Sequence, residues 1–340
     1  LSKGAQGIPT LPALLPDYVL RNGTVADIRK ADCVMAWGRK PSAIKALAIA
    51  SRANLPVVTL EDGFLRSMGL GADEPPLSLI VDDLGVYYDA SAPSRLEQLI
   101  ATPLSPAEAI RARALQQLWQ QQRVSKYNDA RIEHPELPDD CVLLADQTFG
   151  DASLQGADPQ AFNAMLEAAL ERYPTSTVLL KVHPDVVAGR KQGHFDLAAL
   201  ATHPRVQVLA NHVHPAELLP RMRAVYVMTS QLGFDALLWN VPVHTWGMPF
   251  YAGWGLTRDS QPLTRRTRRL SLDELVAGVL LRYARYADPH TALPCDAWHA
   301  LACLSNPSPP RLRLQPRVRA LLNYTRTMLG FPRAAVPLKD

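Results

Sequence analysis

The stretch CVMAWGRKPSAIKALAIASRANLPVVTLEDG, residues 33–63, decides the fold class of this 340-residue chain. Residues 33–37 are apolar and end at Gly38, which is typical of a buried strand, and residues 56–60 repeat this pattern. Residues 42–53 between them have the composition and spacing of a helix. A strand, a helix and a second strand in succession predict parallel pairing through a crossover helix.

The same alternation continues along the chain. Further strands are predicted at residues 77–88 (with a turn at Asp83), 141–145, 177–182, 206–209, 224–228 and 241–245. Further helices are predicted at 94–102, 106–124, 159–173, 196–201, 215–222, 233–239, from 271 onward, 297–304 and 316–328. The chain is thus expected to be an α/β protein.

Polar and proline-rich residues around position 138 separate two α/β halves. We therefore expect one Rossmann-like domain over residues 11–137 and a second over 138–265, facing each other across a cleft. The helical residues 266–330 are expected to pack back across the N-terminal domain. This arrangement rests on the alternation of elements, because the two halves share no sequence repeat.

The composition, 47% hydrophobic and 20% charged, is that of a globular protein. The four cysteines include no CxxC pair, so neither a structural zinc site nor a disulfide framework is expected, and the thiols are expected to be reduced. No apolar run reaches the roughly 18 residues that span a bilayer, and no signal-peptide pattern is visible, which favours a cytoplasmic protein.

The net charge is only +4, but arginines gather near the C-terminus. They are Arg265, Arg266, Arg268, Arg269, Arg311, Arg313, Arg317, Arg319, Arg326 and Arg333. This distribution indicates contact with a polyanion or an anionic membrane surface. A solvated helical surface is the alternative interpretation.

Polar side chains that follow strands are the first candidates for a site, because open parallel sheets bind ligands beyond the carboxyl ends of their strands. Glu61, Asp62 and Arg66 follow residues 56–60, and adjacent ionised carboxylates repel, which suits one of them to acid or base chemistry. An N-cap in a solvated loop is the alternative. Asp146 and Gln147 follow residues 141–145, where the carboxylate suits a nucleophile or base, or else a helix N-cap.

A histidine between a lysine and a proline follows residues 177–180. Pro184 restricts His183 to extended geometry, and with Lys181 nearby the pair suits a phosphate. A surface histidine at a turn is the alternative, because two other His-Pro pairs occur in the chain.

Two further places follow later strands. Thr229, Ser230 and Gln231 precede a predicted helix, where hydroxyls and free N–H groups bind anions or simply cap the helix. The loop 247–257 contains three glycines and three aromatic residues, which suits stacking on a sugar or base and equally a structured core loop.

Several motifs are absent from the sequence. It contains no Walker A sequence, no GxGxxG after a strand, no HExxH and no GxSxG. These absences argue against a P-loop NTPase, a dehydrogenase, a zinc hydrolase and an α/β-hydrolase. No DxD-type metal motif is evident either, so no catalytic metal site is predicted.

Eight stretches together resemble one known family. They are EDGFLRSMGLG (61–71), PPLSLIVDDLGVYYDASAPSRLE (75–97), SKYN (125–128), DQTFGDAS (146–153), KVHPD (181–185), VYVMTSQLGFDALL (225–238), PFYAGWGLT (249–257) and RYARYADPHT (282–291). In this order they resemble the KpsC-type capsular-polysaccharide Kdo transferases, over roughly residues 32–289. The chain looks most like the N-terminal of the two transferase modules in full KpsC proteins, and its length leaves room for one module.

This resemblance implies a GT-B arrangement and a retaining β-Kdo transferase that uses CMP-β-Kdo. Residues 11–137 would form the acceptor side and residues 138–265 the CMP-Kdo-binding domain. The implied acceptor is a Kdo-terminated, phosphatidylglycerol-type lipid at the inner face of the cytoplasmic membrane, where the protein would be peripheral. It implies no nucleic-acid partner. A catalytically idle module that binds lipid or a capsule-assembly partner, or another CMP-sugar transferase, remain as alternatives.

The resemblance also assigns roles to the candidate residues. Asp146 would be the nucleophile of a double displacement through a covalent Kdo-enzyme intermediate, and Glu61 or Asp62 the acid/base group. His183 would hold the CMP phosphate, and Lys181 and Arg66 the Kdo carboxylate. The remaining donor-binding candidates are Gln147, Pro184, Thr229, Ser230 and Gln231. CMP leaves with one phosphate, so the resemblance implies neither a metal nor another cofactor.

Overall fold

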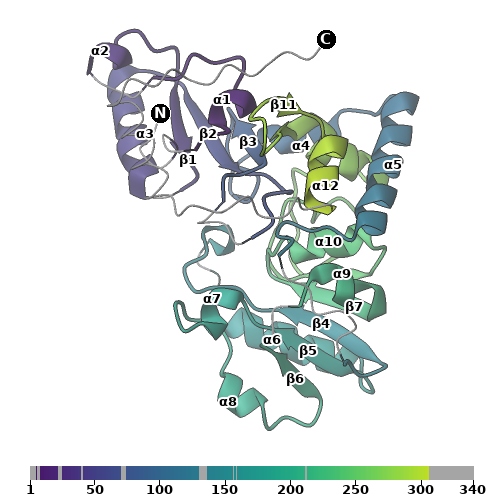
Figure 1. Cartoon of the computed structure of the whole chain (residues 1–340). Coiled ribbons are helices and arrows are strands. Elements are labelled where there is room, and N and C mark those ends of the chain that lie inside the picture. The colour runs from purple at the N-terminus through teal and green to yellow at the C-terminus, as the bar shows by residue number, and fades with distance from the viewer. Residues whose placement is uncertain are drawn as a thin grey trace, which may run out of the picture. The chain divides into compact units, whose positions relative to one another are not determined.

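The computed structural model describes residues 5, 8–21, 25–39, 41–69, 74–129, 136–155, 157, 159–210 and 213–305. Within these ranges the strands form one sheet of five strands and another of six (Figure 1). The first has the order β1-β2-β3-β10-β11 and contains β1 (Val34–Trp37), β2 (Val57–Asp62), β3 (Ser78–Asp82), β10 (Ala284–Ala287) and β11 (Pro294–Cys295). The second has the order β6-β5-β4-β7-β8-β9 and contains β4 (Cys141–Ala145), β5 (Thr177–Lys181), β6 (Val206–Leu209), β7 (Met222–Val227), β8 (Val243–Thr245) and β9 (Arg258–Asp259).

The first sheet is parallel only between β1 and β2. Helix α3 (Pro41–Ala53) connects these strands, as the stretch 33–63 predicts. The pairs β2–β3, β3–β10 and β10–β11 are antiparallel, so the expectation of a parallel sheet is wrong for this part of the first half. Parallel neighbours need a crossover, usually a helix, and the described residues between β2 and β3 contain none.

The second sheet is parallel throughout. The chain runs from β4 outward through β5 to β6, returns to β7 beside β4, and continues outward through β8 to β9. This is the strand order of the doubly wound dinucleotide-binding fold, so the parallel pairing predicted for this half is confirmed. All five residues of β4 are buried, which explains the continuous apolar run at 141–145.

Helices accompany both sheets. Helix α6 (Pro159–Arg172) lies between β4 and β5 in the chain, and α10 (Leu232–Leu238) lies between β7 and β8. The other helices are α1 (Leu11–Leu14), α2 (Val25–Ile28), α4 (Arg95–Ala101), α5 (Pro106–Gln122), α7 (Pro184–Val187), α8 (Leu197–Leu200), α9 (Pro215–Leu218), α11 (Leu272–Val276) and α12 (Ala297–Ser305), with 3₁₀ turns η1 (Ala152–Leu154) and η2 (Leu219–Arg221). Among the described residues, no helix combines the length and apolar character needed to cross a bilayer.

The helix predicted from Ser271 starts as expected and then changes type. Ser271 and Glu274 form a capping box at its start. After α11 the chain continues as a π-helix, η3 (Ala277–Tyr283), which the spacing of apolar residues does not distinguish from an α-helix. A Cβ at Gly278 would lie 3.2 Å from the Ile100 Cα of α4, so η3 and α4 pack closely there. The predicted helix at 316–328 lies outside the described residues.

The last described elements return to the first sheet. Strand β10 pairs with β3, and α11 and α12 both pack against α5. Arg282 of η3 forms an ion pair with Glu108 of α5 at 2.8 Å. One hydrophobic cluster includes buried residues of both sheets, among them Ile80 of β3 and Leu143 of β4. The domain boundaries at 137/138 and 265/266 and the arrangement across a cleft stay predictions.

Candidate functional site

The candidate site begins where the strand order of the second sheet reverses, between β4 and β7. In sheets of this order, ligands bind beyond the carboxyl ends of the strands at the reversal. Asp146 follows β4 directly, and Thr229 lies two residues beyond the end of β7. The structure therefore brings these two predicted residues to the same edge of the sheet.

The Asp146 carboxylate is buried, and its two oxygens have different surroundings. Oδ1 accepts hydrogen bonds from the backbone N–H of Gln147 at 2.8 Å and of His194 at 3.1 Å. Oδ2 has no hydrogen-bond partner within the described ranges. Burial raises the pKa of Asp146, although the two N–H donors oppose this change. The backbone thus orients one of the two carboxylate oxygens.

A loop between α7 and α8 lies against that second oxygen. A Cβ at Gly193 would be closer than 3.0 Å to Asp146 Oδ2, so only glycine fits there without a shift. The neighbouring His194 stacks on Phe162, with a centroid distance of 3.9 Å and an interplanar angle of 4°. Neither ring nitrogen of His194 has a hydrogen-bond partner in the part of the chain that the structure describes. Gly193 and His194 were not predicted from the sequence, because they follow no strand and belong to none of the quoted stretches.

Gln147 connects the ends of β4 and β7. Its Oε1 accepts a hydrogen bond from the Thr229 N–H at 2.9 Å, and its Nε2 donates to Thr229 Oγ1 at 3.0 Å. The hydroxyl of Ser153 lies 2.7 Å from the same Thr229 Oγ1. Asp151 in turn fixes Ser153 by accepting its backbone N–H at 2.9 Å. Amide and hydroxyl groups are therefore held in place beside Asp146.

Lys181 and His183 extend this edge to the end of β5. The Lys181 carbonyl accepts a hydrogen bond from the Asp146 N–H at 3.0 Å, and burial lowers the pKa of its ammonium to about 8. Nδ1 of His183 accepts a hydrogen bond from the Asp185 N–H at 3.1 Å. Burial also lowers the pKa of His183, so the ring is neutral at pH 7 and carries its proton on Nε2. Pro184 is the first residue of α7, a position where proline is favoured.

Ser230 and Gln231 make contacts at the start of α10. The Ser230 carbonyl accepts a hydrogen bond from the Tyr251 hydroxyl at 2.5 Å, and its Oγ accepts one from the Leu232 N–H at 3.3 Å. Nε2 of Gln231 donates to the Phe64 carbonyl at 3.0 Å, which links this segment to the loop after β2. Gln231 Oε1 has no partner among the described residues.

The acidic residues of the first sheet lie together at the end of β2 with Arg66. Glu61 accepts a hydrogen bond from the Trp37 indole N–H at 3.2 Å. Asp62 Oδ1 lies 3.2 Å from Arg66 Nε, close enough for an ion pair but outside hydrogen-bond geometry. Arg66 is buried, and its Nη1 donates to the Glu74 carbonyl at 2.9 Å. The two adjacent carboxylates therefore have different partners.

A second buried carboxylate, Asp235 of α10, was not predicted from the sequence. Its Oδ2 accepts a hydrogen bond from the Ser125 hydroxyl at 2.6 Å. Burial raises the pKa of Asp235 to about 7, against the opposing effects of Ser125 and Lys126. Lys126 also interacts electrostatically with Glu61 and Asp62. Asp235 lies in the quoted stretch 225–238, and Ser125 and Lys126 lie in the quoted stretch 125–128, but none of the three was assigned a role from the sequence.

The aromatic residues of the loop 247–257 belong to the core. Phe250, Tyr251 and Trp254 are all buried, and the Phe250 ring packs against Phe64 at a centroid distance of 5.0 Å. They are therefore not exposed for stacking on a sugar or base. Of the two interpretations that the sequence left open, the structured core loop is confirmed.

The basic cluster at 265–269 makes contacts inside the chain. Arg265 and Arg266 pair with Glu97 at 2.8 and 2.7 Å, and the Arg266 side chain is only 2% exposed. Arg268 pairs with a glutamate of α11. The basic residues from Arg311 onward lie outside the described residues. Contact with an anionic surface therefore stays a prediction, and it no longer rests on these three paired arginines.

Fold and site together define a class of protein. It is an α/β protein whose doubly wound sheet holds a buried carboxylate, amide and hydroxyl groups, and the ammonium of Lys181 at the carboxyl ends of its strands. The sequence matches the family described as Capsule polysaccharide biosynthesis protein, over residues 32–136 and 106–286. The chain belongs to this family, and its predicted resemblance to the KpsC type is confirmed.

Two curated relatives support this assignment. The chain is 42% identical over 311 residues to the capsule polysaccharide modification protein LipA of Neisseria meningitidis serogroup B, a match that covers 85% of this chain and 43% of LipA. The chain thus spans less than half the length of LipA. It is 36% identical over 308 residues to the lipopolysaccharide-processing protein LpsZ of Rhizobium meliloti, a match that covers 85% of this chain and 68% of LpsZ.

Two solved structures from Thermosulfurimonas dismutans are also similar. The first, of KpsC and titled beta Kdo 2,4 transferase, has a TM-score of 0.81 and 40% identity, and covers 88% of this chain and 95% of that one. The second, of KpsC and titled beta Kdo 2,7 transferase, has a TM-score of 0.66 and 28% identity, and covers 87% and 94%.

Proposed function

We propose that the chain is a retaining β-Kdo glycosyltransferase that moves Kdo from CMP-β-Kdo onto a Kdo-terminated, phosphatidylglycerol-type lipid in capsule linker synthesis. The observation that carries the proposal is the 40% identity, at a TM-score of 0.81, with a protein titled beta Kdo 2,4 transferase. The identity with the 2,7 transferase is lower, at 28%, which favours a 2,4 linkage in the product. Two Rossmann-like domains in a GT-B arrangement would hold donor and acceptor.

Asp146 is the proposed nucleophile. In the first step a carboxylate oxygen of Asp146 bonds to the anomeric carbon of Kdo, and the bond from that carbon to the phosphate oxygen breaks, so that CMP leaves with the electron pair. In the second step the acceptor hydroxyl oxygen bonds to the same carbon, displaces the carboxylate and gives its proton to a base. Two inversions give net retention. The backbone donors on Oδ1 support this role because they fix the orientation of the attacking group.

The proposed base is Glu61 or Asp62, which have different partners in the structure. Protonation of Asp62 would break its ion pair with Arg66. Glu61 accepts hydrogen bonds from the Trp37 indole and from the Asp62 backbone N–H, and both carboxylates interact electrostatically with Lys126. Both residues end the same strand, which is why the sequence alone does not separate them.

The donor phosphate is proposed to bind at the ends of β4, β5 and β7. His183 would offer its Nε2–H to a phosphate oxygen, and Lys181 would add a positive charge. The other proposed donor-binding residues are Gln147, Pro184, Thr229, Ser230 and Gln231, with Arg66 as a further candidate for the Kdo carboxylate. Because the leaving group carries a single phosphate, we propose that these groups suffice without a metal.

Donor binding must expose the second oxygen of Asp146. In the structure that oxygen is buried against Gly193, so the anomeric carbon cannot reach it until the loop or the carboxylate moves. A movement that keeps the His194 N–H on Oδ1 would open Oδ2 without losing its orientation. The protein is further proposed to act in the cytoplasm, peripheral to the inner membrane, where the lipid acceptor is presented.

The test is a transfer assay with CMP-β-Kdo and a synthetic Kdo acceptor, followed by NMR analysis of the linkage. The proposal predicts a β-2,4 product and loss of transfer in Asp146→Asn. The matched control is Asp196→Asn, which keeps the N-cap of α8 and should transfer normally. Intact-protein mass spectrometry should detect a Kdo adduct on the wild type that is absent from Asp146→Asn.

Other outcomes would identify another function. Preferred transfer from CMP-Neu5Ac would indicate a different CMP-sugar enzyme. Flotation with anionic liposomes without transfer from either donor would indicate an idle binding module. Full transfer by Asp146→Asn would refute the assignment of the nucleophile.

A further inference from the structure

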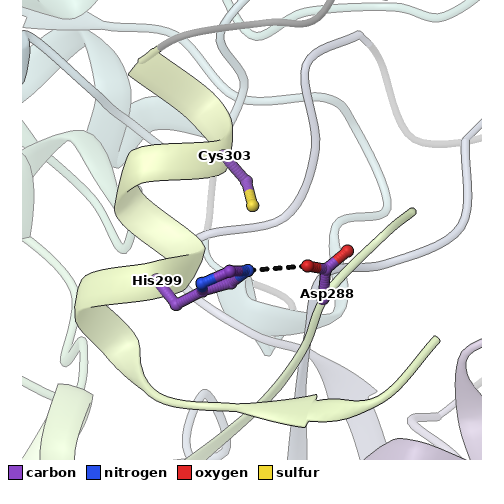
Figure 2. A group of neighbouring side chains, drawn as sticks. All are labelled: Asp288, His299 and Cys303. Carbon is purple, nitrogen blue, oxygen red and sulfur yellow. Dashed lines mark hydrogen bonds and ion pairs between the residues drawn. The ribbon is translucent and has the colours of Figure 1, made fainter. Parts of the chain in front are cut away.

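Three side chains with metal-binding groups meet where β10 ends and α12 passes beside it. Nε2 of His299 lies 2.7 Å from Oδ2 of Asp288. One ligand atom from each of Asp288, His299 and Cys303 lies within 4.8 Å of the other two. Figure 2 shows His299 and Cys303 on one face of α12, both directed toward Asp288.

The local structure fixes this geometry without an ion. His299 and Cys303 are four residues apart in α12, so their side chains lie on the same face of the helix. Asp288 is held from its other side, because Oδ1 accepts hydrogen bonds from the backbone N–H of His290 at 2.7 Å and of Thr291 at 3.0 Å. Oδ2 is thereby turned toward α12.

We propose that Asp288, His299 and Cys303 form a binding site for a divalent transition-metal ion of the zinc class, separate from the sugar-transfer site. A thiolate, an imidazole and a carboxylate are the ligands that Zn²⁺ uses, whereas Mg²⁺ and Ca²⁺ take oxygen ligands. Zinc–ligand bonds of about 2.0–2.3 Å place tetrahedral ligand atoms roughly 3.3–3.8 Å apart. The 2.7 Å contact between His299 Nε2 and Asp288 Oδ2 would have to lengthen to hold the ion between them.

The charges of the three groups fit such an ion. The Asp288 carboxylate accepts two backbone N–H donors, which favour its ionised form. Burial raises the pKa of Cys303, so the free thiol is protonated. Binding of the ion would release the Cys303 thiol proton to solvent, and His299 would bind through a ring nitrogen that carries no proton. No electron transfer is involved.

The bound ion would join α12 to the end of the first sheet. Asp288 directly follows β10, and Cys295 of the neighbouring strand β11 interacts electrostatically with both Cys303 and Asp288. The absence of a CxxC pair excludes a zinc ribbon. It does not exclude a metal site whose ligands come from one turn of a helix and from the end of a strand. The site would therefore stabilise the position of α12.

The test uses the full chain, treated with a chelator and then titrated with Co²⁺ as the probe. The wild type should bind one equivalent and show a thiolate-to-cobalt charge-transfer band, which Zn²⁺ abolishes by displacement. Cys303→Ser should lose this band, and His299→Ala should bind at least about tenfold more weakly. The matched controls are Cys33→Ser and His203→Ala, which replace the same residue types outside the site and should bind like the wild type.

Thermal denaturation distinguishes a variant that has lost metal binding from a variant that has lost its fold. Excess Zn²⁺ should raise the melting temperature of the wild type and both controls, and leave Cys303→Ser and His299→Ala unchanged. Absence of the charge-transfer band from the wild type would overturn the proposal. Its persistence in Cys303→Ser would do the same, because the thiolate would then come from another cysteine.

Discussion

Gly193 offers the sharpest test of the site, because a single methyl group there acts directly on Asp146. In Gly193→Ala the new Cβ would be closer than 3.0 Å to Asp146 Oδ2 and 3.3 Å from Val186 Cγ1. Gly193 does not lie in the left-handed region, so alanine adds no backbone strain. Either the carboxylate or the loop must therefore move by about 1 Å to restore ordinary contact.

A displacement of about 1 Å in a reacting group costs on the order of 100-fold in rate. We expect Gly193→Ala to lower kcat by this factor, which corresponds to about 2.7 kcal/mol in activation free energy. The assay is initial-rate transfer from CMP-β-Kdo, with the free energy of unfolding measured in parallel by urea titration. Stability should change little, because the loop lies at the edge of the sheet.

The matched control is Gly189→Ala in the same loop. Gly189 has a φ of +67° and no atom within 4 Å of its added Cβ. Alanine there should cost about 1–2 kcal/mol of stability through backbone strain and leave kcat unchanged. The reasoning is refuted if Gly193→Ala transfers Kdo at the wild-type rate, or if both variants lose activity equally.

Three further predictions concern charges. Glu97→Gln should destabilise the fold by about 3–5 kcal/mol, because it leaves the Arg266 guanidinium buried without its counter-charge. Urea titration measures this loss in the free energy of unfolding. The control is Asp83→Asn, which removes an exposed ion pair and should cost less than about 1 kcal/mol. Asp235 has a raised folded-state pKa, so its contribution to stability is complete below about pH 4 and is lost as the pH rises through about 7. Asp235→Asn should remove this pH dependence of the free energy of unfolding. If the variant keeps the same dependence, Asp235 is not its source. Transfer should fall on the acid side as the pH drops through the raised pKa of Asp146, because the nucleophile must be ionised; constant activity down to pH 4 would exclude that role.

The second sheet was predictable because its signals are local. Each of β4, β5, β6 and β7 is a short apolar run followed by a helix, so their parallel pairing was predictable from the sequence. The first sheet was only partly predictable. Strand β3 pairs with β10, about 200 residues later in the chain, and nothing in either segment specifies that partner.

The residues of the candidate site also fall into some that the sequence predicts and some that it does not. Asp146, Gln147 and Lys181 were predictable, because residues at strand ends share one edge of a parallel sheet. His194 was not, since its N–H reaches Asp146 from 48 residues away through a loop without a periodic pattern. Asp235 was hidden among apolar residues of a helix, where only the folded structure shows that its carboxylate is buried.

The return of β10 and β11 to the first sheet has a consequence for how the chain is made. A ribosome releases β1, β2 and β3 long before β10, so the nascent first half exposes the edge of β3 while the entire second sheet is synthesised. Unpaired edges of this kind attract other strands and promote aggregation. The second sheet, whose strands are contiguous in the chain, can fold first and hold the early strands near their late partners. A chain that stops before residue 284 would keep that exposed edge permanently.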